Sequence, residues 1–146
     1  MPKPSGSTRK FLLDTNVFIA AVKDTERQTG TLRLLLKIIT DPSIGLVGNV
    51  LLAEELSRYA ELFESERAAV LIAALLAKME IGVVPAGCVR ACRAHISTPD
   101  RVDVLHAATC LQTGAALITD DRHFDGIKAA GIIEVWSVSE AIKRLL

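Results

Sequence analysis

Short apolar segments alternate with helix-like segments along nearly the whole of this 146-residue chain. Such alternation is typical of a parallel β-sheet, because parallel strands need helical crossover connections that cover both faces of the sheet. Half of the residues are hydrophobic, which fits strands that are buried on both faces. The sequence therefore predicts an α/β fold, a three-layer α/β/α sandwich with a central, mainly parallel sheet.

The expected elements follow from apolar periodicity and from residues that start and stop helices. Residues 1–8 are rich in Pro, Gly, Ser and Thr and are expected to form a disordered tail, and residues 9–146 are expected to form one domain. We expect strands at 10–14, 44–48, 82–84, 116–119 and 132–135, and helices at 15–22, 30–40, 50–63, 65–79, 87–96, 100–113 and 138–145.

Acidic residues follow two of the expected strands. Asp14 ends the first strand, and Asp121 follows the strand at 116–119. In open parallel sheets, ligands collect outside the carboxyl ends of the strands, so these positions favour chemistry. Each residue could alternatively cap a helix or make a turn. However, the adjacent charges of Asp120 and Asp121 repel one another unless a cation compensates them.

A third acid, Glu55, is expected on the buried face of the helix that starts near residue 50. At about 100° per residue, Glu55 falls within the apolar arc and Glu54 falls nearly opposite, where it can pair with Arg58. A carboxylate on a buried face is costly unless it is paired or bound to a metal. The apolar line of this helix comprises Leu52, Leu56, Tyr59 and Phe63.

The fourth acid, Asp103, lies in the first turn of the helix at 100–113, where Thr98 is the expected cap and Pro99 suits the first helical position. Asp103 shares a face with Ala107 and Cys110, whose small side chains would let the helix approach the sheet. An ordinary first-turn aspartate, favoured by the helix dipole, is the alternative.

Together the four acids offer hard oxygen ligands of the kind that Mg²⁺ or Mn²⁺ takes, with too few nitrogen or sulfur partners for a zinc site. A water acidified by such an ion is a nucleophile for a phosphodiester, and the ion also neutralises charge on phosphate oxygens. Metal-assisted phosphodiester hydrolysis is therefore the leading chemistry.

Four segments, in this order and spacing, resemble the PIN-domain ribonucleases, in particular the virulence-associated toxins of toxin-antitoxin pairs. The resemblance covers nearly the whole chain. It implies an α/β/α sandwich whose metal-binding and catalytic acids, Asp14, Glu55, Asp103 and Asp121, bind one or two Mg²⁺ or Mn²⁺ ions and cut RNA. The segments are Leu13-Asp14-Thr-Asn16-Val-Phe-Ile, Leu-Ala-Glu54-Glu55-Leu, Asp103-Val-Leu-His-Ala-Ala-Thr and Leu-Ile-Thr119-Asp-Asp121-Arg-His-Phe124.

The resemblance also implies supporting residues around these acids. Thr119 and Asp121 match the T-x-D-x-x-F form of the last motif. Two alternatives stay open, because Glu54 could replace Glu55, and Asp100 could act as a ligand through water. The residues expected to support the site are Asn16, Asp100, Thr119 and Asp120.

Small single-domain PIN proteins are often toxins held inactive by a small antitoxin, and they commonly form homodimers, so the resemblance implies both partners. Three rivals remain: a non-catalytic RNA-binding or scaffold protein with this fold, a DNA-directed nuclease, and a doubly wound phosphatase. Haloacid-dehalogenase-like phosphatases need a second aspartate two residues after the first, and this chain has Asn16 there.

The net charge is zero, so affinity for RNA must come from a local cationic patch. Arg101 and Arg122 lie next to the proposed site in the sequence and are the candidates for phosphate contacts. Six aromatic residues leave little for base stacking, so recognition is expected through backbone and shape. Other candidate cations, most of which fit solvated surface better, are Lys3, Arg9, Lys10, Arg90, Arg93 and His95, together with His123 beside the fourth acid.

The three cysteines form no C-x-x-C pair, and the chain starts with no apolar signal segment, so a reduced cytoplasmic location is expected. Cys88, Cys92 and His95 could line one helix face as metal ligands, but core packing explains the cysteines better, and we also favour packing for His106. The longest apolar stretch, 68–77, is too short to span a membrane, and either the core or a second subunit could cover it.

Overall fold

The computed structural model describes residues 9–23, 29–97 and 100–146. Its five strands form one sheet in the order β3-β2-β1-β4-β5, and every neighbouring pair is parallel. The strands are β1 (Arg9–Leu13), β2 (Ile44–Gly48), β3 (Glu80–Ile81), β4 (Ala116–Ile118) and β5 (Val135–Trp136). The predicted parallel sheet is confirmed.

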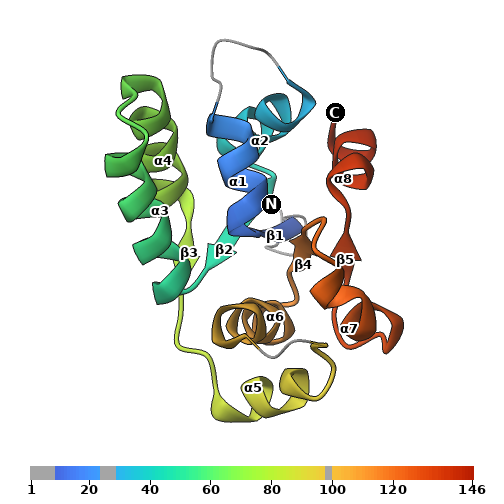
Figure 1. The fold of residues 1–146 in the computed structure, drawn as a ribbon. Helices are drawn as coiled ribbons and strands as arrows, with labels where there is room; N and C mark the ends of the chain where they lie inside the picture. Colours follow the sequence, from blue (N-terminus) through green and yellow to red (C-terminus); the bar gives the residue numbers. More distant parts are fainter. Residues whose placement is uncertain (1–8, 24–28, 98–99) are drawn as a thin grey trace, which may run out of the picture.

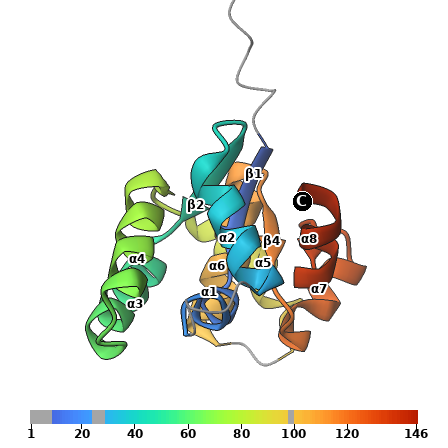
Figure 2. The same ribbon diagram turned by 90° about the horizontal axis from the view of Figure 1, so that it is seen from above.

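Helices cover both faces of this sheet (Figure 1). The helix α6 contacts β1, β2 and β4 on one face, with α5 outside it, and α1 and α2 lie on the other side. The pair α3 and α4 flanks one end of the sheet, and α8 the other, as the turned view also shows (Figure 2). The helices are α1 (Thr15–Val22), α2 (Gly30–Thr40), α3 (Val50–Leu62), α4 (Glu66–Lys78), α5 (Ala86–Arg93), α6 (Arg101–Thr113), α7 (Asp125–Ala129) and α8 (Val138–Leu145). The three-layer α/β/α sandwich is confirmed.

The central strand β1 sets the position of the edge where chemistry is expected. Its last three residues, Phe11 to Leu13, are buried and pair with Ala116 to Ile118 of β4. The amide of Asp14 continues this ladder by donating to the carbonyl of Ile118 at 3.1 Å. Asp14 and Thr119 therefore emerge side by side at the carboxyl edge of the sheet.

Small side chains bring α6 close to the sheet, as its sequence predicted. Ala107 and Ala108 are fully buried, and the helix ends at Gly114, which has a left-handed φ of 75° that glycine adopts without strain. The predicted cap Thr98 and the predicted first residue Pro99 lie outside the described residues. The helix begins at Arg101, and Asp100 is its N-cap.

Several predicted boundaries were wrong. The third strand pairs with β2 through Glu80 and Ile81, whereas residues 82–84 leave the sheet edge, and Val83 is 88% exposed. The fifth strand is Val135–Trp136 instead of 132–135. The helix α5 ends at Arg93, so His95 lies beyond it.

The helix α7 and the short 3-10 helix η2 (Arg122–Phe124) that precedes it were missed. This segment is a run of acidic, basic and glycine residues that resembles a turn. Gly126 has a structural reason to be there, because a Cβ at this position would lie 2.8 Å from the carbonyl oxygen of His95. The close approach of Gly126 to residue 95 and the burial of Phe124 and Ile127 in the core together position α7.

The apolar stretch 68–77 forms most of α4, and only one face of it reaches the core. Ala68, Ile72 and Leu75 are buried, whereas Val70 is 67% exposed. The core and α3 cover part of this helix, and the face that carries Val70 and Ala73 is exposed in this single chain. In the described part of the chain, no helix has both the length and the apolar character needed to cross a membrane.

Candidate metal centre

Asp14 is held at the carboxyl edge by a partner from the far end of the chain. Its side chain is buried, and its Oδ2 accepts a hydrogen bond from Thr119 Oγ1 at 2.8 Å. The same hydroxyl oxygen accepts the backbone amide of Asp121 at 3.0 Å. One threonine therefore connects two of the predicted metal-binding acids.

The pKa of Asp14 is raised from its usual value. Burial is the largest cause, and the negative charges of Asp103 and Asp121 act in the same direction. The hydrogen bond from Thr119 and the backbone amide of Asn16 oppose the rise. A cation near these three carboxylates would oppose this rise in the pKa of Asp14, because it would stabilise the ionised carboxylate.

Asp103 and Asp121 approach one another around the imidazole of His123. The Nδ1 of His123 lies 3.0 Å from Asp103 Oδ2 and 3.3 Å from Asp121 Oδ1. Asp121 Oδ1 also accepts the amide of His123 at 2.9 Å, which caps η2. These three residues offer ligand atoms that all lie within 4.8 Å of one another.

The electrostatics of this group reflect its crowding. Burial raises the pKa of Asp103, as does repulsion from Asp100 and Asp121, while the hydrogen bond with His123 opposes the rise. The pKa of His123 is raised, chiefly by that hydrogen bond to Asp103. The raised pKa favours the protonated imidazole, which would carry a positive charge between two carboxylates.

Glu55 lies near this group but contacts it indirectly. Its Oε1 accepts from Thr15 Oγ1 at 3.3 Å, one residue after Asp14. Glu55 is half-buried and Glu54 is exposed, as the helical face predicted. Asp103 and Asp121 therefore share ligand spacing with His123. Asp14 is joined to Asp121 through Thr119, and Glu55 on α3 contacts the residue after Asp14.

The neighbouring acids bond to nearby backbone amides, although the charge of Asp100 also helps to raise the pKa of Asp103. Asp120 accepts the amide of Val138 at 2.9 Å and so supports the start of α8, and Asp100 accepts the amide of Val102 at 2.7 Å at the start of α6. Both side chains already have local structural partners. The remaining residues from the predicted site, all exposed, are Asn16, Arg101 and Arg122.

A buried polar network lies between the two helices that carry Glu55 and Asp103. Asn49 caps α3 by accepting the amide of Leu52 at 2.9 Å, and its Nδ2 lies 3.1 Å from both His106 Nδ1 and Thr109 Oγ1. Because the amide donates, His106 Nδ1 accepts and the imidazole is neutral. Burial lowers the pKa of His106 to about 4. Packing of His106 is confirmed, and the network also ties α3 to α6.

The cysteines belong to the core. Cys92 and Cys110 are buried, and burial raises the pKa of the Cys92 thiol to about 11. Since the thiolate is the metal-binding form, these environments disfavour metal binding. Within the described residues, the group with metal-ligand spacing is the one formed by Asp103, Asp121 and His123.

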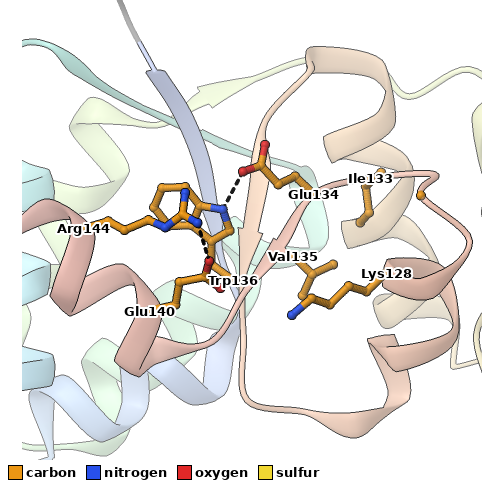
Figure 3. Close-up of a pocket in the computed structure, with 8 residues that line it drawn as sticks. Lys128, Ile133, Glu134, Val135, Trp136, Glu140 and Arg144 are labelled. Carbon is orange, nitrogen blue, oxygen red and sulfur yellow. Dashed lines mark hydrogen bonds and ion pairs between the residues drawn. The ribbon is translucent and has the colours of Figure 1, made fainter.

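A pocket of about 450 Å³ beside β5 is lined by none of the four predicted metal-binding acids (Figure 3). Arg144 lies over the Trp136 ring at 4.7 Å and pairs with Glu140 at 2.9 Å. Glu134 accepts from Trp136 Nε1 at 2.6 Å and pairs with Arg9. Because Arg144, Glu140, Glu134 and Arg9 pair within this cluster, we interpret the pocket as a structural feature rather than a ligand site.

The donor set at the carboxyl edge fits a divalent cation. The carboxylates of Asp14, Asp103 and Asp121 are hard oxygen ligands. Burial and repulsion from neighbouring acids raise the pKa of Asp14 and of Asp103, so positive charge would stabilise their ionised forms. Sequence reasoning missed His123, which it treated as surface charge. Its position two residues after Asp121, in the same turn, was the available signal.

Comparison with known proteins agrees with this geometry. The family model described as PIN domain matches residues 11–130. PIN domains are generally divalent-metal-dependent nucleases. A search of curated proteins gave no match.

Three solved structures share the fold. VapBC2 from Rickettsia felis, bound to a DNA fragment from its promoter, has a TM-score of 0.61 and 16% identity, over 88% of this chain and 98% of that one. FitAB bound to an IR36 DNA fragment has a TM-score of 0.60 and 20% identity, over 88% and 94%. VapBC-1 from nontypeable Haemophilus influenzae has a TM-score of 0.58 and 17% identity, over 89% and 98%. With the family model matching residues 11–130, this chain belongs to the PIN-domain family.

Proposed function

We propose that this chain is a divalent-metal-dependent endoribonuclease that hydrolyses RNA phosphodiester bonds. The observation that carries the proposal is the convergence of Asp14, Asp103 and Asp121 at the carboxyl edge of the sheet, joined through Thr119 and His123. The matching family supports the same reaction class.

In this proposal, Asp14, Asp103 and Asp121 hold Mg²⁺ or Mn²⁺, and Glu55 completes the set. Glu55 accepts a hydrogen bond from Thr15, the residue after Asp14, which supports its assignment. A bound ion would supply an acidified water and neutralise charge on the phosphate oxygens. Thr119 orients the Asp14 carboxylate, while Arg101 and Arg122 are the cations nearest in sequence to the acids and would contact the RNA backbone.

We further propose that the chain is the toxin of a toxin-antitoxin pair and forms a homodimer. VapBC and FitAB, which are among the solved structures with this fold, support the toxin assignment. The exposed apolar face of α4 supports the homodimer. A short open reading frame beside the gene, whose product blocks RNA cleavage on co-expression, is expected. Light scattering over a range of concentrations is expected to give the dimer mass.

Cleavage of single-stranded RNA by the purified chain tests the enzymatic proposal. The chain is expected to cleave RNA with Mg²⁺ or Mn²⁺ and to stop when EDTA is added. The Asp121→Asn variant is expected to be inactive. A matched Asp120→Asn variant, whose side chain faces α8, is expected to retain activity. Equal cleavage by wild type and Asp121→Asn would overturn the assignment, and cleavage of DNA alone would favour a DNA-directed nuclease.

A further inference from the structure

Three buried polar residues lie in a row where three neighbouring strands end. Asp14 directly follows β1, Asn49 directly follows β2 and Thr119 directly follows β4, and β1 lies between the other two strands. The pairing registers of β1 with β2 and with β4 bring these three positions to the same level at the carboxyl edge. Asn49 therefore flanks Asp14 on the side opposite Thr119, the residue that joins Asp14 to Asp121.

Every polar group of the Asn49 side chain has a partner. Its Oδ1 accepts the amide of Leu52 at 2.9 Å, which caps α3. Its Nδ2 lies 3.1 Å from His106 Nδ1 and 3.1 Å from Thr109 Oγ1, both on α6. The Thr109 hydroxyl donates to the carbonyl of Leu105 at 2.7 Å, so its oxygen accepts from Nδ2. The carboxamide is therefore fixed from both ends.

These contacts link two helices that each carry a predicted metal-binding acid. Asn49 caps α3, which carries Glu55, and its two donors go to α6, which carries Asp103. In the part of the chain that the structure describes, they are the hydrogen bonds that join the start of α3 to α6. His106 lies three residues after Asp103, and residues three apart are neighbours on a helix surface. The link therefore holds α6 within one turn of Asp103.

A polar network is an unfavourable way to fill this part of the core. Asn49, His106 and Thr109 are each at most 2% exposed, and burial of a polar group costs free energy unless the group is bonded. His106 accepts at Nδ1, so its Nε2 carries the proton, and this atom has no partner among the described residues. Local rules of this kind are broken most often where function requires it. Core packing alone therefore does not account for these three residues.

We propose that Asn49 is a positioning residue of the metal centre, which holds Glu55 on α3 and Asp103 on α6 in place for a divalent cation. The carboxamide acts through the two helices and not on the cation. The inference rests on the proposed metal-dependent function. It gives the third residue of the row at the carboxyl edge a role beside those of Asp14 and Thr119.

Titration of Mn²⁺ into the purified chain, followed by calorimetry well below the melting temperature, tests this role. Asn49→Ser keeps a residue that caps helices but is too short to reach α6. Thr109→Val keeps the shape of its side chain and removes one acceptor. Each variant is expected to raise the Kd for Mn²⁺ about tenfold, the low end for residues that orient metal ligands from outside. The double variant is expected to bind no more weakly than Asn49→Ser, because both changes remove the same link.

Two controls separate positioning from a general loss of stability. Ser65→Ala removes the N-cap of α4, where the hydroxyl accepts the amide of Ala68 at 3.3 Å. This variant is expected to melt lower than wild type and to keep the wild-type Kd for Mn²⁺. Thr109→Ser, which keeps the hydroxyl, is expected to recover most of the affinity that Thr109→Val loses. Circular dichroism checks that each variant is folded at the temperature of the titration.

A wild-type Kd for Mn²⁺ in both Asn49→Ser and Thr109→Val would overturn the positioning role and leave the metal centre intact. An equal loss of affinity in Ser65→Ala would also overturn it, because general destabilisation would then explain the effect. If wild type itself binds no Mn²⁺, the metal centre fails, and Asn49 has no role in it. Should Asn49→Ser not fold, the comparison of Thr109→Val with Thr109→Ser decides.

Discussion

Thr119 donates a hydrogen bond from Oγ1 to Asp14 Oδ2 at 2.8 Å, although 105 residues separate them. Both residues directly follow paired strands, β1 and β4, so the sheet register brings them together. The same oxygen accepts the amide of Asp121 at 3.0 Å. This hydroxyl sets the relative positions of two acids of the proposed metal site.

Thr119→Val is expected to lower both stability and RNA cleavage. The substitution keeps the shape of a side chain that is 4% exposed but leaves the amide of Asp121 and the carboxylate of Asp14 without this partner. Leaving a buried polar group unsatisfied costs about 1–3 kcal/mol, which urea unfolding can measure. Thr119→Ser, which retains the hydroxyl, is expected to recover most of both losses. Equal stability and equal RNA cleavage in Thr119→Val and Thr119→Ser would contradict a role for the hydrogen bond.

The buried imidazole of His106 predicts a loss of stability in acid. Its pKa is lowered to about 4 in the folded chain, against 6.5 when unfolded, so the unfolded state binds more protons between these values. Stability therefore falls as the pH falls from 6.5 towards 4, and the effect is complete below that. Between pH 7.5 and pH 5, His106 is expected to account for a loss of about 2 kcal/mol.

The measurement is urea unfolding of wild type and His106→Gln at these two pH values. The glutamine carbonyl can accept from Asn49 in place of Nδ1 but does not titrate. The variant is expected to lose about 2 kcal/mol less than wild type on acidification. Parallel losses in the two proteins would show that His106 does not carry this pH dependence.

Gly126→Ala is expected to destabilise the fold by about 1–3 kcal/mol, as overpacking usually does. Alanine is favoured over glycine in a helix by about 1 kcal/mol, but its Cβ would lie 2.8 Å from the His95 carbonyl oxygen, so the clash outweighs the gain. Gly87→Ala in α5 is the matched control, because the nearest atom to its Cβ is the end of Arg90 at 3.9 Å. Thermal melting is expected to show a loss for the first and none for the second. A gain in both would contradict the close approach of α7 to residue 95.

His123→Ala is expected to enlarge the stabilisation that Mn²⁺ gives. Its Nδ1 contacts both Asp103 and Asp121, so in the metal-free protein the imidazole competes with a cation for these carboxylates. Removing it is expected to lower the melting temperature without metal and to widen the rise on adding Mn²⁺. A smaller rise than in wild type would instead identify His123 as a ligand.

Most of the architecture could be predicted from the sequence, because strands buried on both faces are continuously apolar and the helices carry clear caps. Asp14 and Asp121 could be assigned to the carboxyl edge of the sheet because they follow predicted strands. Glu55 could be assigned to the inner face of α3 from its angular position among the apolar residues of the helix. The positions of the short strands β3 and β5 were predicted wrongly, since the bounds of a two-residue edge strand are set by its hydrogen bonds to the neighbouring strand and not by its own sequence. The position of His123 two residues after Asp121 indicated that it lies near this acid, but its contact with Asp103 on α6 depends on tertiary packing and could not be predicted.

The central claim is that Asp14, Asp103 and Asp121 form a divalent-cation site, and thermal melting with and without Mn²⁺ tests it without knowledge of the RNA target. Saturation at 100 times Kd stabilises a folded protein by about 2.7 kcal/mol, or roughly 5–11 °C in a chain of this size. Wild type is expected to show this rise. Asp14→Asn is expected to melt higher than wild type without metal, because one buried like charge is gone, and to rise little with Mn²⁺. No response of wild type to Mn²⁺, or an equal rise in Asp14→Asn, would contradict the metal site.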